Sequence, residues 1–255
     1  MKTLIVGIVF NLTIPELIPF LKSVRKHYTG NVCIVTPETD SSILTLYKTY
    51  NIDVYHANID NDRNIAFKQR LYIINELLKT QYADVDRVFF TDIRDVYFFG
   101  DIFSYTTPAE ITFFSEPYLI GDCSINSRWY EMTYGADKLA NISHEMIICN
   151  GTILATKQGM LDYTDCMIKE LDNVTYVIDQ PITNHIVYSD RLVNCEIQDH
   201  GLGPIGTFAH DKHMEYCKFV GDKLYNVING KEVLVVHQYD RCSILQSNIL
   251  NWCLK

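Results

Sequence analysis

The first part of the chain alternates short apolar runs with longer amphipathic segments. Short runs bounded by polar residues predict buried strands, whereas apolar residues recurring every three or four positions predict helices. On this basis we expect strands at 3–9, 31–35, 52–55 and 88–91, and helices at 13–28, 40–50 and 64–79. Strands that alternate with helices in this order predict a Rossmann-like, mostly parallel sheet flanked by helices.

The pattern becomes less regular beyond residue 103. Strands are expected at 111–115, 146–155 and 192–197, and helices at 158–171 and 179–188. The polar, aromatic segment 121–135 predicts a mixture of helix and loop. Asn229-Gly230 stands between apolar segments at 224–228 and 232–237 and predicts a C-terminal β-hairpin. The sequence contains no linker or repeat, so we expect one mixed α/β domain over 1–255.

Composition and charge exclude several classes of protein. The 255 residues are 47% hydrophobic and 21% charged, which is typical of a globular protein with a sizeable core. A formal net charge of −9 argues against a nucleic-acid partner, because phosphate backbones are held by clustered Lys and Arg. No apolar run approaches the ~20 residues that a transmembrane helix needs. The eight cysteines contain no C-x-x-C pair, so a structural zinc site has no support.

The N-terminus favours a cytoplasmic protein. The apolar core of 1–10 is short and no small-residue cleavage site follows it, so we interpret this segment as the first strand and not as a signal peptide. Glycosylation sequons begin at Asn11, Asn141, Asn150 and Asn173. Two of them fall in segments that we place near the candidate site, where a glycan would be awkward in a secreted protein.

The strand at 88–91 ends at three charged residues, Asp92, Arg94 and Asp95. In open α/β sheets, ligands bind outside the carboxyl ends of the strands, and carboxylates there suit a divalent cation and the phosphates that it carries. We expect these carboxylates to be exposed in a loop. The alternative is that Asp92 caps a turn and Asp95 pairs with Arg94.

His237 is the best-placed further ligand, because it also follows an apolar run, Val233 to Val236. An imidazole with two carboxylates suits Mn²⁺ and also accommodates Mg²⁺. A structural role for this histidine is the alternative.

Two further polar clusters interrupt apolar segments. Asp179 and Gln180 stand at the start of a predicted helix with Asn184 one turn later, and capping alone would account for Asp179. Asn150 and Gly151 interrupt an apolar strand, which indicates either a bulge or a close approach by a ligand.

The chain resembles the GT-A-fold glycosyltransferases, which transfer a sugar from a nucleotide diphosphate donor, over roughly Thr3 to Arg241. The resemblance rests on four segments in order, VFFTDIRDVYFFGDIF, CNGTILAT, IDQPITNH and VVHQYDR. It implies that Asp92 and Asp95 form the acidic metal motif and that His237 is the late histidine ligand. The family usually has one residue between its acids, whereas two separate them here, so both reach one ion only if the chain turns between them.

The resemblance also implies an activity, a metal-dependent transfer of a sugar from a UDP- or GDP-linked donor to a hydroxyl of a glycan or other acceptor. In the glycogenin-like retaining members, IDQ lies beside the transferred sugar, which makes Asp179 and Gln180 the catalytic candidates and slightly favours retention. An inverting enzyme would use Asp179 as base. The alternatives are a non-catalytic nucleotide-sugar or carbohydrate-binding protein on the same fold, or another metal-dependent phosphate-handling enzyme.

The donor would then contact the loops after the first strands. The predicted donor-binding residues are Phe10, Asn11, Arg70, Asp92, Arg94, Asn150 and Gly151, and the predicted acceptor platform is Asn126, Trp129 and Tyr130. We expect residues 1–105 to bind the nucleotide sugar and residues 106–255 to bind the acceptor. The sequence leaves open whether the chain forms a homodimer.

Overall fold

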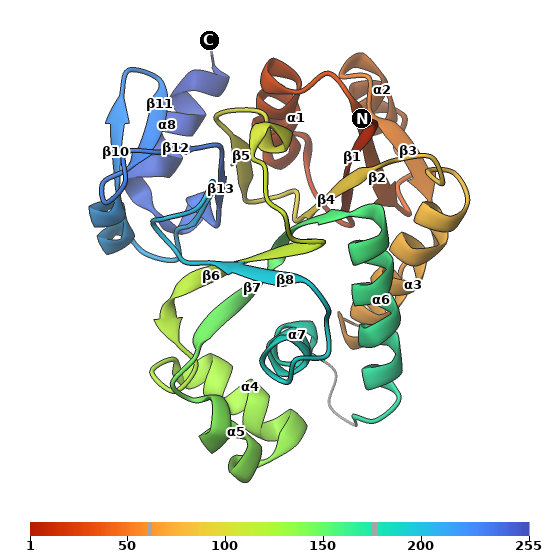
Figure 1. The fold of residues 1–255 in the computed structure, drawn as a ribbon. Coiled ribbons are helices and arrows are strands. Elements are labelled where there is room, and N and C mark those ends of the chain that lie inside the picture. Colours follow the sequence, from red (N-terminus) through yellow and green to blue (C-terminus); the bar gives the residue numbers. More distant parts are fainter. Residues whose placement is uncertain (61–62, 175–177, 255) are drawn as a thin grey trace.

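Seven strands form one mixed sheet at the centre of the molecule (Figure 1). The computed structural model describes residues 1–60, 63–174 and 178–254, without the side chains of residues 63 and 64. In spatial order the strands are β3 (Asp53–His56), β2 (Asn31–Thr36), β1 (Thr3–Ile8), β4 (Arg87–Thr91), β7 (Met146–Thr156), β6 (Ile111–Leu119) and β8 (Cys195–Gln198).

The direction of the strands confirms the predicted fold class. β1 pairs in parallel with β2 and β4, β2 with β3, and β8 with β6. β7 runs antiparallel to both of its neighbours, β4 and β6. The sheet is therefore mixed and mostly parallel, and β7 joins the regular first half to the less regular second half.

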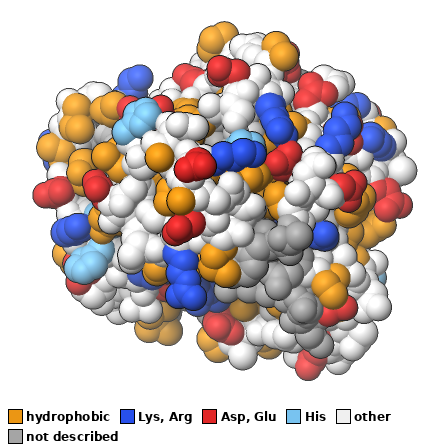
Figure 2. All heavy atoms as spheres, turned by 90° about the horizontal axis from the view of Figure 1, so that it is seen from below, with side chains coloured by type: hydrophobic (Ala, Val, Ile, Leu, Met, Phe, Trp, Pro, Cys, Tyr) orange, Lys and Arg blue, Asp and Glu red, His pale blue; other side chains and the backbone are white. Residues whose placement is uncertain are grey.

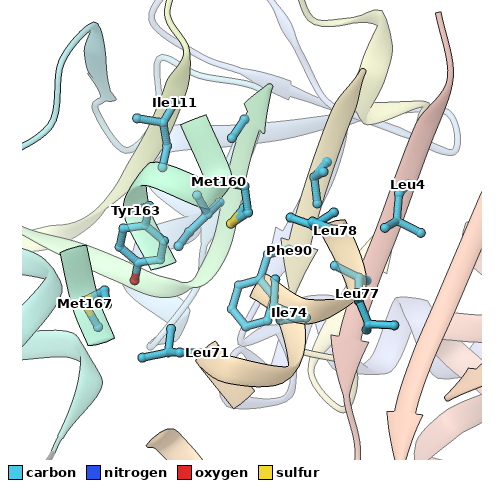
Figure 3. Close-up of a cluster of buried hydrophobic side chains, with 14 of the residues drawn as sticks. Leu4, Leu71, Ile74, Leu77, Leu78, Phe90, Ile111, Met160, Tyr163 and Met167 are labelled. Atoms are coloured by element: carbon cyan, nitrogen blue, oxygen red, sulfur yellow. The ribbon is translucent and has the colours of Figure 1, made fainter. Parts of the chain in front are cut away.

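Helices cover both faces of this sheet, because successive strand residues point to opposite sides. α3 (Arg63–Lys79) and α6 (Lys157–Leu171) pack on one face, where Leu71 and Met160 meet Phe90 of β4 (Figure 3). α1 (Ile14–His27) packs on the other face against Phe89. The other helices are α2 (Ser41–Thr49), α4 (Ser124–Tyr134), α5 (Ala136–Ile142), α7 (Asp179–Tyr188) and α8 (Ser243–Cys253), with 3₁₀ turns at Ile102–Ser104, Asp211–Tyr216 and Tyr239–Arg241.

The predicted C-terminal hairpin forms, but it is shorter than expected. β11 (Lys223–Asn226) pairs antiparallel with β12 (Glu232–Val233), and β10 (Cys217–Val220) completes this small sheet. The single strand expected at 232–237 was wrong, because it divides at Leu234, whose N–H donates to Pro204 O at 2.7 Å.

The residues after Leu234 enter a different sheet. β13 (Val235–His237) lies between β5 (Val96–Phe98) and β9 (Ile205–Thr207), antiparallel to the first and parallel to the second. Val235 and Val236 point to opposite sides of this strand and are both fully buried, so other elements must pack on both sides. A hairpin alone would not bury both side chains. The central position of β13 brings its last residue beside the end of β4.

One face of the molecule carries α4, α5 and α7 (Figure 1). Acidic, basic and hydrophobic side chains are interspersed over this face (Figure 2). Within the described ranges, no helix combines the length and the apolar character that crossing a membrane requires.

Candidate metal and donor site

Asp92, Asp95 and His237 converge at the end of β4. The chain bends directly after Thr91, and β5 begins at Val96, so both carboxylates face the same space. β5 pairs with β13 in the register that sets Val96 opposite His237. Nε2 of His237 lies 3.4 Å from Asp92 Oδ2 and 3.6 Å from Asp95 Oδ1. The required turn between the two acids is thus present, and all three potential ligand atoms lie within 4.8 Å of one another.

The imidazole of His237 contacts a cysteine on the side of the ring opposite the two carboxylates. Its Nδ1 lies 3.1 Å from the Sγ of Cys149 on β7, and the side chain is only 3% exposed. Its Nε2 has no hydrogen-bond partner among the described residues. A neutral ring that donates its Nδ1–H to the sulfur presents the Nε2 lone pair to the two carboxylates. One nitrogen and carboxylate oxygens in this arrangement fit Mn²⁺ or Mg²⁺.

The electrostatics of this triad favour a bound cation. Burial raises the pKa of Asp95, and the nearby Asp92 and Asp240 raise it further. Burial alone would also raise the pKa of Asp92, but His237, Arg70 and Arg94 bring it below its usual range. Although burial opposes the charged form of His237, Cys149, Asp95 and Asp92 raise its pKa well above the ordinary value. The site therefore stabilises positive charge, whether from a proton or from a metal ion.

Gly151 leaves room for this triad. The pairing of β6 with β7 shifts register between Phe113 and Phe114, and residues 150–152 of β7 form the irregularity. Gly151 O accepts the N–H of Asp92 at 2.8 Å. A Cβ at Gly151 would lie 2.5 Å from Cε1 of His237 and 2.6 Å from Oδ2 of Asp92. Only glycine allows the backbone of β7 to come so close to the candidate ligands.

Arg70 joins the triad to the start of α7. Its guanidinium forms an ion pair with Asp179 and lies 4.0 Å from Asp92 Oδ1. It also lies over the ring of Phe90, 5.1 Å from the centroid, and its side chain is 12% exposed. Asp179 is the first residue of α7, and Ile178 is the N-cap, so the capping role considered for Asp179 was wrong by one position.

Gln180 and Asn184 point to different partners. Gln180 Nε2 donates to Glu116 Oε1 at 2.8 Å. Asn184 Oδ1 accepts the N–H of Ile148 at 2.9 Å, and its Nδ2 donates to Ile148 O at 3.2 Å. The Asn184 side chain therefore makes the two backbone hydrogen bonds that a neighbouring strand would make to Ile148. This is a structural role.

Several buried polar atoms on residues that form or flank the triad lack a partner within the described part of the chain. Asn150 illustrates the pattern, because its Oδ1 accepts from Tyr163 Oη at 2.7 Å and from Thr183 Oγ1 at 3.0 Å while its Nδ2 has none. Such atoms are rare in proteins and call for a ligand, ion or water. They are Arg70 Nε, Asn150 Nδ2, Thr152 Oγ1, His237 Nε2, Gln238 Oε1 and Asp240 Oδ1.

Comparisons with known proteins add information about the fold. No family model and no curated protein sequence matches the chain. A solved structure is similar to it, that of a glycosyltransferase involved in the glycosylation of the major capsid of PBCV-1, with a TM-score of 0.50 and 11% sequence identity. The match covers 100% of this chain and 99% of the other. The fold is glycosyltransferase-like. Its mixed, mostly parallel sheet is consistent with the GT-A type.

On this glycosyltransferase-like fold, the three other predicted donor residues differ in whether they contact the triad. Arg94 NH1 pairs with Asp240 at 3.1 Å, and its NH2 lies 3.5 Å from Asp95, so the pairing considered as an alternative to metal binding also occurs. Phe10 and Asn11 lie in an exposed loop after β1. No hydrogen bond or ion pair between described residues joins Phe10 or Asn11 to the triad.

The predicted acceptor platform is only partly exposed in this glycosyltransferase-like fold. Tyr130 is 2% exposed, and its hydroxyl lies 2.9 Å from Nδ1 of His185, so its assignment to the platform was wrong. It faces inward because α4 packs against α7. Trp129 lies on the outer side of α4 with Arg128 and lines a shallow depression of about 320 Å³. Asn126 donates from Nδ2 to the Cys123 sulfur at 3.3 Å.

Glu116 is the site residue that we did not predict. It lies on β6, is 7% exposed and is fixed by Gln180. Its signal in the sequence is a charged residue inside an apolar strand, ITFFSEPYL. Such a residue almost always has a partner when it is buried, but the sequence alone does not say which.

Proposed function

We propose that the protein is a metal-dependent glycosyltransferase that moves a sugar from a nucleotide diphosphate donor, UDP- or GDP-linked, to a hydroxyl of a glycan or other acceptor. The glycosyltransferase-like fold supports glycosyl transfer in general. The observation that carries the proposal is the unpartnered Nε2 of His237, which faces two carboxylates at the end of a central strand.

The metal ligands in this proposal are Asp92, Asp95 and His237. A divalent cation bound there would offset the negative charge that develops on the departing diphosphate. Gly151 leaves space beside this position, and the unpartnered Nδ2 of Asn150 is available to a ligand oxygen. Arg70 adds a fixed positive charge next to Asp92. Preorganised charges of this kind stabilise a transition state without rearranging at the moment of reaction.

The same contacts bear on stereochemistry. The Asp179 carboxylate is engaged by Arg70 through its Oδ2, so this oxygen is not free to take the proton of an acceptor hydroxyl. This pairing supports the slight preference for retention, with Asp179 and Gln180 beside the transferred sugar, over inversion with Asp179 as base. The division into a donor half, 1–105, and an acceptor half, 106–255, and the cytoplasmic location are part of the same proposal.

Turnover of nucleotide sugars tests this function. The purified protein is incubated with UDP-glucose, UDP-galactose or GDP-mannose, with Mn²⁺ or with EDTA, and released nucleotide diphosphate is measured together with the configuration of the sugar product. We expect metal-dependent release from at least one donor. Metal-dependent binding of a donor without any turnover would instead indicate a carbohydrate-binding protein on this fold, and cleavage of simple phosphoesters would indicate another phosphate-handling enzyme.

A further inference from the structure

Glu116 is a buried carboxylate that the proposed donor and metal roles do not use. It lies on β6 one residue beyond Ser115, which pairs with Ile148 of β7. Phe114, two positions before it, pairs with Cys149, whose sulfur contacts His237. The register of β6 on β7 thus places Glu116 on the strand next to the irregular segment at the site, on the side away from β4.

The Asp179-Gln180 pair links this carboxylate to the donor side. Asp179 forms an ion pair with Arg70, which also approaches Asp92, whereas the next residue, Gln180, donates to Glu116 at 2.8 Å. Adjacent residues at the start of one helix therefore contact two different elements, α3 through Arg70 and β6 through Glu116. If the sugar lies beside Asp179 and Gln180, Arg70 stands toward the diphosphate and Glu116 stands toward the attacking group.

The surroundings of Glu116 suit a substrate hydroxyl. Burial raises its pKa, while Gln180, His237 and Arg241 lower it only in part. A carboxylate in these surroundings accepts a hydrogen bond from a hydroxyl more strongly than an exposed one does. Gln180 is the only hydrogen-bond partner that the described side chains give it, and it engages one of its two oxygens.

We propose that Glu116 binds the attacking hydroxyl of the acceptor, as the residue that orients this hydroxyl toward the sugar held beside Asp179 and Gln180. The substrate class is any hydroxyl nucleophile, so water takes the same place when the donor is hydrolysed. This inference rests on the proposed function, since it presupposes a bound nucleotide sugar. It assigns to Glu116 contact with the acceptor and none with the nucleotide or the metal.

Donor hydrolysis separates these roles without knowledge of the natural acceptor. Glu116→Gln keeps the size of the side chain and an acceptor oxygen for Gln180, but it removes the charge. We expect hydrolysis of UDP-glucose, UDP-galactose or GDP-mannose, whichever wild type uses, to fall by about 10- to 100-fold through loss of a charge-assisted hydrogen bond. The thermal shift produced by the matching nucleotide diphosphate with Mn²⁺ should stay as in wild type.

Two variants keep this test decisive. Glu116→Asp retains the charge but shortens the side chain by one methylene, so it should also lose hydrolysis. If Glu116→Gln does not fold, Glu116→Asp alone tests the acceptor role. Glu196→Gln changes a partly buried carboxylate on the neighbouring strand β8, which bonds to Thr107 and not to the site, and should leave hydrolysis unchanged.

The outcomes distinguish failure of this inference from failure of the proposed function. Unchanged hydrolysis in folded Glu116→Gln and Glu116→Asp would overturn the acceptor role. Loss of the nucleotide shift together with hydrolysis would overturn it as well, because Glu116 would then serve the donor or the fold. Absence of any nucleotide binding or turnover in wild type would instead reject the proposed function itself, and the acceptor role with it.

Discussion

Two regions of the molecule bury histidine in opposite ways. His237 faces Asp92 and Asp95 and contacts Cys149, and its pKa is raised well above the ordinary value despite its burial. His200 and His213 are equally enclosed, but their rings meet each other and aromatic side chains, with centroids 5.9 Å apart. Burial lowers the pKa of both to about 4.

The difference teaches how to separate a ligand from a core histidine. All three side chains carry a ring nitrogen without a hydrogen-bond partner, so an unpartnered nitrogen alone does not mark a site. Carboxylates facing that nitrogen do, because they attract a cation, either a proton on the imidazole or a metal ion that replaces it. The comparison predicts that changes near His237 alter ligand binding, whereas changes near His200 and His213 alter stability.

The largest expected effect is that of Asp95→Asn. Removal of a candidate ligand should lower the affinity for Mn²⁺ by more than about 100-fold, since loss of a residue that merely hydrogen-bonds to a metal ligand already costs about 10- to 100-fold. Stability without metal should stay the same or rise, because burial and Asp92 disfavour the ionised form of Asp95. Isothermal titration with Mn²⁺ and thermal unfolding with EDTA measure these two quantities.

Asp101→Asn is the matched control in the same stretch of chain. The Asp101 side chain accepts the N–H of Phe103 at the start of a 3₁₀ turn, and asparagine caps such turns equally well. This variant should bind Mn²⁺ as wild type does. Wild-type affinity in a folded Asp95→Asn protein would remove Asp95 from the ligand set.

Gly151→Ala should lower donor turnover by about 100-fold, the typical cost of displacing catalytic groups by about 1 Å. The new methyl group would overlap His237 and Asp92, so at least one of them must move. Gly100→Ala serves as control, because its methyl group would meet the flexible end of Leu234 and none of the candidate ligands. Equal turnover in Gly151→Ala and wild type would show that the space beside the triad is not needed.

A smaller effect is expected from pH on the core histidines. Their folded-state pKa of about 4 lies below the ordinary 6.5, so the unfolded chain takes up protons first as the pH falls. The neutral forms therefore stabilise the fold fully above pH ~6.5, and this stabilisation is lost between there and pH ~4, by about 2 kcal/mol at pH 5 for the more enclosed His200. Urea unfolding at pH 7 and pH 5 should show a smaller loss in His200→Gln than in wild type. Identical losses would contradict the assignment.

Much of the fold follows from local pattern. The strands and helices of the first half were predicted closely because their hydrophobic periods are clear and turn residues separate them. The helix expected at 64–79, for example, is observed at Arg63–Lys79. β5, β9 and β13 have three residues each, which is too short for a period to show. Only tertiary pairing creates these strands, and they are the ones that bring His237 to Asp95.

The candidate site was predictable as a set of residues but not as a set of contacts. The polar interruptions of apolar strands drew attention to Asp92, Asp95, Gly151 and His237. The burial of Asp95 was not predicted, since this residue is 5% exposed and not the open loop carboxylate that we expected. The pairing of Arg70 with Asp179 and of Gln180 with Glu116 depends on α3, α7 and β6 meeting, which no local pattern encodes.

The most direct test of the central claim is a thermal-shift screen of UDP, GDP, ADP and CDP, each with Mn²⁺ and with EDTA. A ligand that binds only the native state stabilises it by about 2.7 kcal/mol at a hundredfold excess over its dissociation constant. We predict a shift with UDP or GDP in the presence of Mn²⁺, absent with EDTA and in Asp95→Asn. The same melting temperature for wild type under all of these conditions would contradict the assignment of Asp92, Asp95 and His237 as a metal and nucleotide site.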